Sequence, residues 1–263
     1  MKKLNVVISY YKALDNLKLV LKALNNQSCM DFEVTLSEDD NNSETVDFIK
    51  NEAANYAFPI HHIYQTTDNG FKKNQMLNRA IMHTNIQKIA FIDGDCVPHK
   101  HFVKQYILNI TDKTICVGRS VMLDEETTAT LRKTQSLKEL SFLPLLFSKA
   151  KKIKEGIYFP YFPLQYKLRG LVGRNWGCPK SALVAINGFD QDYFFAGIGE
   201  DVDIEWRLLK FGLTEKSVKN KAIVFHLHHK RWYSSENERI NFKMMEQKIE
   251  LNQVRCLNGI ESN

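Results

Sequence analysis

Cysteines are few in this sequence, and none of them forms a recognisable motif. There are five, an odd number, with no Cys-x-x-Cys pair (Cys29, Cys96, Cys116, Cys178 and Cys256). We therefore expect neither a disulfide framework nor a zinc knuckle, and a reducing compartment fits best. Cys96 follows an acidic residue, but we interpret it as a small buried apolar residue rather than a nucleophile.

Long apolar runs are also missing. Met1-Lys2-Lys3 leads into only a few apolar residues before Lys12, which is too short for a signal peptide. No run approaches the roughly 20 apolar residues that a membrane-spanning helix needs. We therefore expect a cytoplasmic protein.

The chain has no strong excess of one charge and no basic stripe interleaved with aromatic residues. Its 36 lysines and arginines against 30 acidic residues give a net charge of +6, which suits an anionic substrate or membrane surface without requiring either. Because the basic and aromatic stripe is missing, nucleic acid is not an expected partner. The 263 residues, 44% of them hydrophobic, are enough for a sizeable core.

The first hundred residues alternate between two kinds of apolar pattern. Short apolar runs predict strands at Leu4–Ser9, Phe32–Leu36, His61–Tyr64 and Ile89–Ile92. Helical spacing predicts helices between them, over 14–24, from an N-cap at Ser43 and near Asn74. This order favours an α/β fold, a Rossmann-like and mostly parallel sheet flanked by helices. The second half is less regular, with a helix from Phe102 and a strand at Ile115–Val117.

Polar residues stand where three of these strands end, at Ser9-Tyr10, Glu38-Asp39 and Asp93-Gly94-Asp95. Parallel sheets bind ligands beyond the carboxyl ends of their strands. Two carboxylates one residue apart on a rigid strand end can hold a hard divalent cation, which can bind a diphosphate. Gly94 lets the backbone turn tightly between them. We therefore predict a site for a nucleotide-activated substrate.

Two lysines, Lys72 and Lys73, lie beside Asn69, Gly70 and Asn78 and could neutralise a diphosphate. The alternative interpretation of these lysines is a solvated helix start.

Two acids, Glu200 and Asp201, follow Gly197-Ile198-Gly199 at the start of a predicted helix. The helix dipole alone could explain an acid there. The functional hypothesis makes Asp201 a general base, with the glycines allowing an acceptor to approach.

His226-Leu227-His228-His229 follows the apolar stretch Ala222–Phe225. A histidine at a strand end can complete a metal site begun by carboxylates, and His226 is nearest to that end. The alternative is an ordinary surface or core histidine.

The segment 132–162 combines positive charge with apolar and aromatic residues. Between Arg132 and Lys154 there are seven basic residues and one acidic residue, around the apolar cluster Phe142–Phe147, and aromatic residues follow at 158–162. One hypothesis is peripheral contact with lipid head groups on the inner face of the plasma membrane. The other is a solvated helix with a core-packed loop.

These segments, in this order, resemble the family 2 glycosyltransferases with the GT-A fold, and the resemblance covers most of the chain. The segment 4–11 resembles the family's opening strand, Glu38-Asp39 its nucleotide-contacting acids, and Asp93–Asp95 its DxD motif. The stretches 175–177, 187–190 and 199–203 resemble the C-terminal half of galactosyltransferase-like enzymes of bacterial polysaccharide assembly. The chain departs from the family at 38–41, Glu-Asp-Asp-Asn instead of Asp-Asp-Gly-Ser, and at 196–199, where Ala-Gly-Ile-Gly replaces Trp-Gly-Gly.

The resemblance implies an inverting hexosyltransferase with a UDP-sugar donor and a glycan or lipid-linked glycan acceptor. It makes Asp201 the base, places Glu200 against the acceptor, and assigns Mn²⁺ or Mg²⁺ to Asp95, His226 and Asp93. The implied nucleotide-sugar contacts are Ser9, Tyr10, Glu38, Asp39, Lys72, Lys73, Asp93, Gly94 and Trp176. We expect one domain over 1–263, with a nucleotide-sugar half at 1–98 and an acceptor half with a C-terminal helix at 99–263.

Two other functions share parts of this pattern. A sugar nucleotidyltransferase usually has a glycine-rich basic loop after its first strand, but the segment 9–13 contains no glycine. A non-catalytic carbohydrate- or nucleotide-binding protein would need neither Glu200 nor Asp201.

Overall fold

The structure is a computed structural model that describes residues 1–68, 70–162, 169–193, 195, 200–230 and 235–262. Strands and helices alternate through the first part of the chain as β1 (Leu4–Tyr10), α1 (Leu14–Asn25), β2 (Phe32–Glu38), α2 (Ser43–Glu52), β3 (Ile60–Ile63), α3 (Lys73–His83) and β4 (Lys88–Asp93). The order predicted from apolar spacing is therefore confirmed. One detail was wrong: the side chain that caps α2 is Asn42, which accepts a hydrogen bond from the backbone N–H of Glu44 at 2.8 Å, and not Ser43.

The rest of the chain contains more short elements than apolar spacing predicts. They are β5 (Cys96–Pro98), α4 (Phe102–Asn109), β6 (Thr114–Val117), β7 (Arg119–Met122), α5 (Glu125–Thr134), α6 (Phe142–Phe147), β8 (Asn175–Pro179), α7 (Lys180–Ala185), α8 (Glu200–Phe211), β9 (Thr214–Ser217), β10 (Ile223–His226) and α9 (Ser235–Glu250). The helix from Phe102 and the strand at 115–117 were predicted, whereas β5, β7 and β9 are too short to leave a clear pattern.

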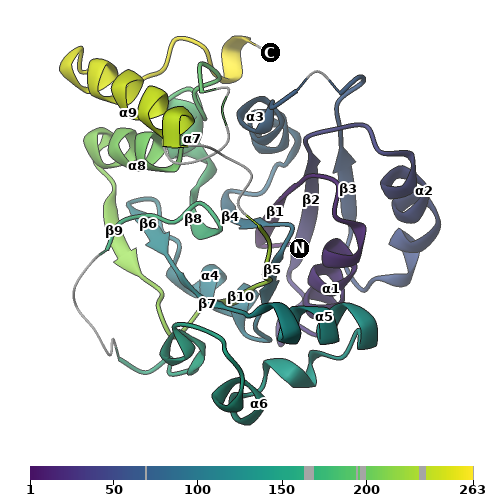
Figure 1. Ribbon diagram of the computed structural model, residues 1–263. Helices are drawn as coiled ribbons and strands as arrows, with labels where there is room; N and C mark the ends of the chain where they lie inside the picture. Colours follow the sequence, from purple (N-terminus) through teal and green to yellow (C-terminus); the bar gives the residue numbers. More distant parts are fainter. Residues whose placement is uncertain (69, 163–168, 194, 196–199, 231–234, 263) are drawn as a thin grey trace.

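A seven-stranded sheet with the order β3-β2-β1-β4-β8-β6-β9 forms the centre of the molecule (Figure 1). β1 to β4 run parallel, β8 is antiparallel to both β4 and β6, and β9 is parallel to β6. A second sheet has the order β5-β10-β7. The predicted mostly parallel sheet is confirmed, and its strands come from both halves of the chain.

Two apolar cores cover the two faces of the large sheet. Along β4, Ala90 and Ile92 belong to one core, and Ile89 and Phe91 to the other. The first core includes residues of α1 and α4, and the second includes residues of α3, α7 and α8. A strand that is covered on both faces needs apolar residues at every position, so β1 and β4 are continuous apolar runs. Each buried Val, Leu or Ile side chain contributes roughly 1.5–3 kcal/mol.

The strand register brings the polar strand ends together. Ser9 on β1 lies opposite Asp93 on β4, and Tyr10 lies opposite Glu38 on β2. The three predicted polar sites therefore share one edge of the sheet. Among the described helices, none has the length and apolar character needed to cross a bilayer.

Candidate active site

Gly94 brings the turn after β4 against the end of β1. Its backbone N–H donates to the carbonyl oxygen of Ser9 at 2.7 Å. A Cβ at position 94 would lie 2.9 Å from a ring carbon of Tyr10 and 3.3 Å from the Ser9 carbonyl oxygen. The φ of Gly94 is not positive. Glycine is thus required here for close approach of two backbones, and the left-handed conformation is not used.

The two carboxylates on either side of Gly94 have different partners. Asp93 Oδ1 lies 3.8 Å from the ammonium of Lys73. Asp95 Oδ2 lies 3.6 Å from Nε2 of His226 and 3.3 Å from Nε2 of His229. The motif therefore joins two polar clusters, one on each side of the turn.

Asp95, Cys96 and His226 form a group whose candidate ligand atoms all lie within 4.8 Å of one another. Antiparallel pairing of β5 with β10 sets His226 opposite Cys96, and the Leu227 N–H donates to the Asp95 carbonyl at 2.9 Å. Asp93, which we also predicted as a metal ligand, is not in this group. Of the three histidines at 226–229, His226 and His229 have ring nitrogens within 4 Å of Asp95 in the described part of the chain.

This donor set fits a divalent metal ion. A carboxylate suits hard cations such as Mg²⁺ and Mn²⁺, and a neutral imidazole is a common ligand of first-row transition metals. Burial lowers the pKa of His226, which favours the neutral ring; Asp95 opposes this shift, and the Arg174 guanidinium adds to it. Burial raises the pKa of Cys96, so its thiol stays protonated and is a poor ligand. The interpretation of Cys96 as a buried apolar residue agrees with its complete burial.

Lys73, at the start of α3, connects the two halves of the site. Its Nζ lies 3.5 Å from Glu200 Oε1 and 3.8 Å from Asp93 Oδ1. Burial acts against the charged form, but Asp93, Glu200 and Asp201 outweigh it and raise the pKa of Lys73. A permanent positive charge is therefore held between the strand-end acid and the acids of α8.

Glu200 and Asp201 occupy the first turn of α8. Burial raises the pKa of Glu200, with Lys73 opposing the shift. Glu200 Oε2 is buried and has no hydrogen-bond partner within the described part of the chain. Asp201 Oδ2 accepts from the backbone N–H of Gly173 at 3.2 Å, which ties α8 to the segment before β8.

Asp203, two residues further along α8, has a structural role. Its carboxylate lies 2.7 Å from Nε of Arg207, and both side chains are buried. Arg207 also donates to the carbonyl oxygens of Ile186 and Gly188 at 3.1 and 2.7 Å. In the segment 200–203, Glu200 and Asp201 therefore line the cavity, and Asp203 forms a buried ion pair that supports the helix.

Six of the predicted site residues, from five elements, line one small cavity of about 20 Å³. It is lined by Ser9, Lys73, Asp93, Trp176, Glu200 and Asp201, together with apolar residues of α3 and β4. Trp176 is 1% exposed and stacks on Phe91 with ring centroids 4.4 Å apart. Its indole forms a rigid wall of the cavity.

The predicted nucleoside acids are buried at the end of β2. Glu38 is fully buried, and its Oε2 lies 2.5 Å from Nε2 of His62. Asp39 Oδ1 accepts from the backbone N–H of Lys72 at 2.9 Å and from Gln65 Nε2 at 3.0 Å. Burial raises the pKa of Asp39 to about 7. The side chain of Lys72 is exposed, so its backbone makes the contact.

Tyr10 acts through its backbone at this edge. Its ring is buried, and its hydroxyl lies 3.1 Å from Thr45 Oγ1 and accepts from the Ala13 N–H at 3.1 Å. Its carbonyl oxygen accepts from the Asp39 N–H at 2.8 Å. Tyr10 thus fixes the position of Asp39.

Arg174 is a site residue that the sequence analysis missed. Its charge acts on both His226 and Cys96, and its Nε donates to Ser120 Oγ at 3.0 Å. The sequence signal that could have identified Arg174 is its position directly before the Asn175-Trp176-Gly177 segment. Asn69 and the segment 196–199, including the glycines expected to admit an acceptor, lie outside the described residues.

The sequence matches the family model described as glycosyl transferase family 2 over residues 5–183. The chain therefore belongs to this family. A second model, described as the N-terminal domain of galactosyltransferase, matches residues 156–230. The predicted family and enzyme class are thus confirmed, and no curated protein matches the chain in sequence.

Solved structures share the fold at low sequence identity. The mannosyltransferase PcManGT from Pyrobaculum calidifontis, in complex with GDP-Man and Mn²⁺, has a TM-score of 0.62 at 13% identity, over 95% of this chain and 64% of that one. S. aureus TarS has a TM-score of 0.59 at 15% identity, over 94% of this chain and 39% of that one. TarS 1-349 in complex with UDP has a TM-score of 0.58 at 15% identity, over 94% and 65%. The fold is GT-A, and the chain spans less than two thirds of the length of these proteins.

Proposed function

We propose that this chain transfers a sugar from a UDP-sugar to a hydroxyl group of a glycan or lipid-linked glycan, with inversion at the anomeric carbon. The observation that carries the proposal is the single cavity that contains Asp93, Lys73, Glu200 and Asp201 beside the Asp95–His226 group. An acid for the donor, a fixed cation and two acids for an acceptor are all within reach of one reacting centre.

Asp201 is the proposed general base. It removes the proton from the acceptor hydroxyl as the oxygen attacks the anomeric carbon, and the bond to the diphosphate breaks in the same step. A single displacement needs one base, unlike the paired carboxylates of a glycosidase. The backbone N–H of Gly173 holds Asp201 in place, and Oε2 of Glu200, which has no partner among the described residues, would accept from an acceptor hydroxyl.

Asp95 and His226 would hold Mn²⁺ or Mg²⁺, which neutralises charge on the leaving diphosphate when it is bound. Lys73 keeps a positive charge between Asp93 and Glu200, and Arg174 adds another beside His226. Asp93 would contact the ribose or the sugar, and Asp39 would contact the nucleoside. The complexes of two structural relatives, one with GDP-Man and Mn²⁺ and one with UDP, support this class of donor.

The test measures UDP release from a panel of UDP-sugars with Mn²⁺, with and without glycan acceptors, for the wild type and Asp201→Asn. We expect turnover to fall by about 10²–10⁴ in the variant, with UDP affinity nearly unchanged. Full activity of Asp201→Asn would contradict the assignment of the base.

The same assay separates the alternatives. Pyrophosphate release from UTP and a sugar phosphate would identify a nucleotidyltransferase. UDP-sugar binding without turnover under any acceptor would identify a binding protein.

A further inference from the structure

The helix α6 (Phe142–Phe147) exposes most of its apolar side chains. Phe142, Leu143, Leu146 and Phe147, here called the α6 patch, are between 51% and 86% exposed, and Leu145 is buried at 2%. The four residues fall at i, i+1, i+4 and i+5, which span a sector of roughly 140° around a helix with 3.6 residues per turn. Soluble proteins rarely leave such a contiguous apolar face without a partner. Within α6, core packing therefore holds only for Leu145, whereas elsewhere in 132–162 Leu140 belongs to the core and Leu137, Ile153 and Tyr158 pack against it.

Positive charges adjoin the α6 patch. Lys149, Lys151, Lys152 and Lys154 follow it and are exposed, and within the described ranges none of them lies within 4 Å of a carboxylate oxygen. The nearest following acid, Glu155, is buried and pairs with Lys219 at 3.3 Å. The charges after the patch are thus of one sign and open to solvent.

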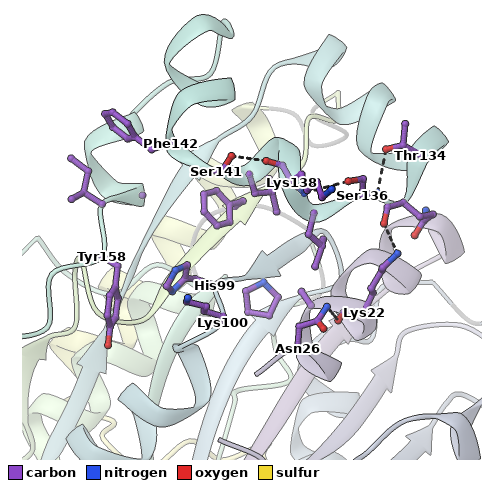
Figure 2. Close-up of a pocket in the computed structure, with 18 residues that line it drawn as sticks. Lys22, Asn26, His99, Lys100, Thr134, Ser136, Lys138, Ser141, Phe142 and Tyr158 are labelled. Atoms are coloured by element: carbon purple, nitrogen blue, oxygen red, sulfur yellow. Dashed lines mark hydrogen bonds between the residues drawn. The ribbon is translucent and has the colours of Figure 1, made fainter. Parts of the chain in front are cut away.

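A large cavity places further lysines next to the patch. It has a volume of about 960 Å³, and Phe142 lines it together with Lys22, Lys100 and Lys138 (Figure 2). None of the cavity residues named in the proposed active site lines it. In Figure 1, α6 and α9 lie at opposite ends of the molecule.

We propose that the α6 patch and its lysines dock this protein on an anionic lipid bilayer. Apolar side chains on one helix face, flanked by lysines, match the interface between acyl chains and acidic head groups. Each lysine near such a surface contributes attraction that salt screens. A protein partner would need to supply both an apolar groove and acidic groups, whereas an anionic bilayer presents both over any area. The inference does not depend on sugar transfer.

The test is flotation of the purified full chain with vesicles of phosphatidylcholine alone or mixed with phosphatidylglycerol. We expect binding to the mixed vesicles that weakens with salt. The double variant Leu143→Ser/Phe147→Ser should bind at least roughly tenfold more weakly. The matched control is Leu108→Ser/Leu251→Ser, which changes residues 63% and 76% exposed elsewhere, and it should bind like the wild type.

A charge variant, Lys149→Gln/Lys151→Gln/Lys152→Gln, should lose the salt-dependent part of the binding. Thermal unfolding of each variant establishes that it folds. Equal binding by the patch variant and the control, or no preference for phosphatidylglycerol, would overturn the proposal. Self-association that only the patch variant abolishes, without vesicle binding by the wild type, would assign the patch to a second copy of the chain instead.

Discussion

At the scale of the residue, adjacent positions with similar side chains have unrelated roles. Lys72 and Lys73 are neighbours, yet Lys72 contributes a backbone N–H to Asp39 while the ammonium of Lys73 is held between Asp93 and Glu200. The backbone N–H of Lys72 is available because Lys72 is the N-cap of α3, where N–H groups have no partner within the helix. The sequence analysis predicted that both lysines contact a diphosphate. In the structure, only the ammonium of Lys73 lies beside the site acids Asp93 and Glu200.

Lys73→Met should lower the kcat of sugar transfer by about tenfold to a hundredfold, because removal of one cation leaves Asp93 and Glu200 as neighbouring acids without compensation. Lys72→Met, which removes an exposed ammonium, should change kcat by less than about twofold. Steady-state kinetics with saturating donor measure both. Equal losses in the two variants would show that the position of Lys73 between the acids has no effect on catalysis.

Asp39 gives the stability of the protein a pH dependence. Its pKa is raised from 3.8 to about 7 by burial, so the folded protein holds this proton over a range in which the unfolded chain has lost it. The free energy of unfolding should therefore fall as the pH rises from about 4 to about 7 and level off above that. Burial raises the pKa of Asp40 to about 7 as well, so its titration also lowers the free energy of unfolding as the pH rises.

Asp39→Asn removes the titrating carboxyl group at position 39 and with it the contribution of Asp39 to the pH dependence of stability. Urea unfolding at a series of pH values should show a shallower decline for Asp39→Asn than for the wild type. An unchanged slope would mean that Asp39 ionises normally, as the two N–H donors on its Oδ1 would favour.

At the scale of the element, α8 presents Glu200 and Asp201 to the cavity from its first turn and is anchored by the buried pair of Asp203 and Arg207. Asp203 and Arg207 are one helical turn apart and buried, and Arg207 holds the carbonyl oxygens of 186 and 188. The same helix start carries Glu200 and Asp201. The buried pair therefore fixes the angle at which these two acids enter the cavity.

Asp203→Asn should lower the stability by about 3–5 kcal/mol, because it leaves the buried Arg207 without its counter-charge. Thermal or urea unfolding measures the change. The matched control is Glu236→Gln, which breaks the exposed pair of Glu236 and Arg239 at 2.8 Å and should cost no more than about 1 kcal/mol. Similar losses in both variants would show that burial does not decide the effect.

At the scale of the whole molecule, the site is assembled from distant parts of the chain. The large sheet brings β1 and β4 beside β8, and the small sheet brings β10 against β5. Asp95 and His226 become neighbours only when β10 pairs with β5 in the small sheet. Binding of a divalent cation should thus report on tertiary structure as well as on catalysis.

His226→Ala should weaken Mn²⁺ binding by about 10- to 100-fold in titration calorimetry with UDP present. His228→Ala should not, because this exposed histidine is not placed against Asp95. Chelation by EDTA should abolish UDP release, and added Mn²⁺ should restore it. Normal affinity in His226→Ala together with loss in His229→Ala would move the ligand to His229, which lies 3.3 Å from Asp95 Oδ2.

The sequence alone determined the alternation from β1 to β4 and the acids at the strand ends. Apolar periodicity and the residues at which it stops are local properties, so they can be read from neighbouring positions. Only the tertiary structure decided that Asp93 faces Lys73 while Asp95 faces His226, that Arg174 belongs to the site, and that Asp203 supports α8. These relations depend on which strands pair and on how helices pack over them, and a single sequence does not encode such long-range pairing in any local pattern.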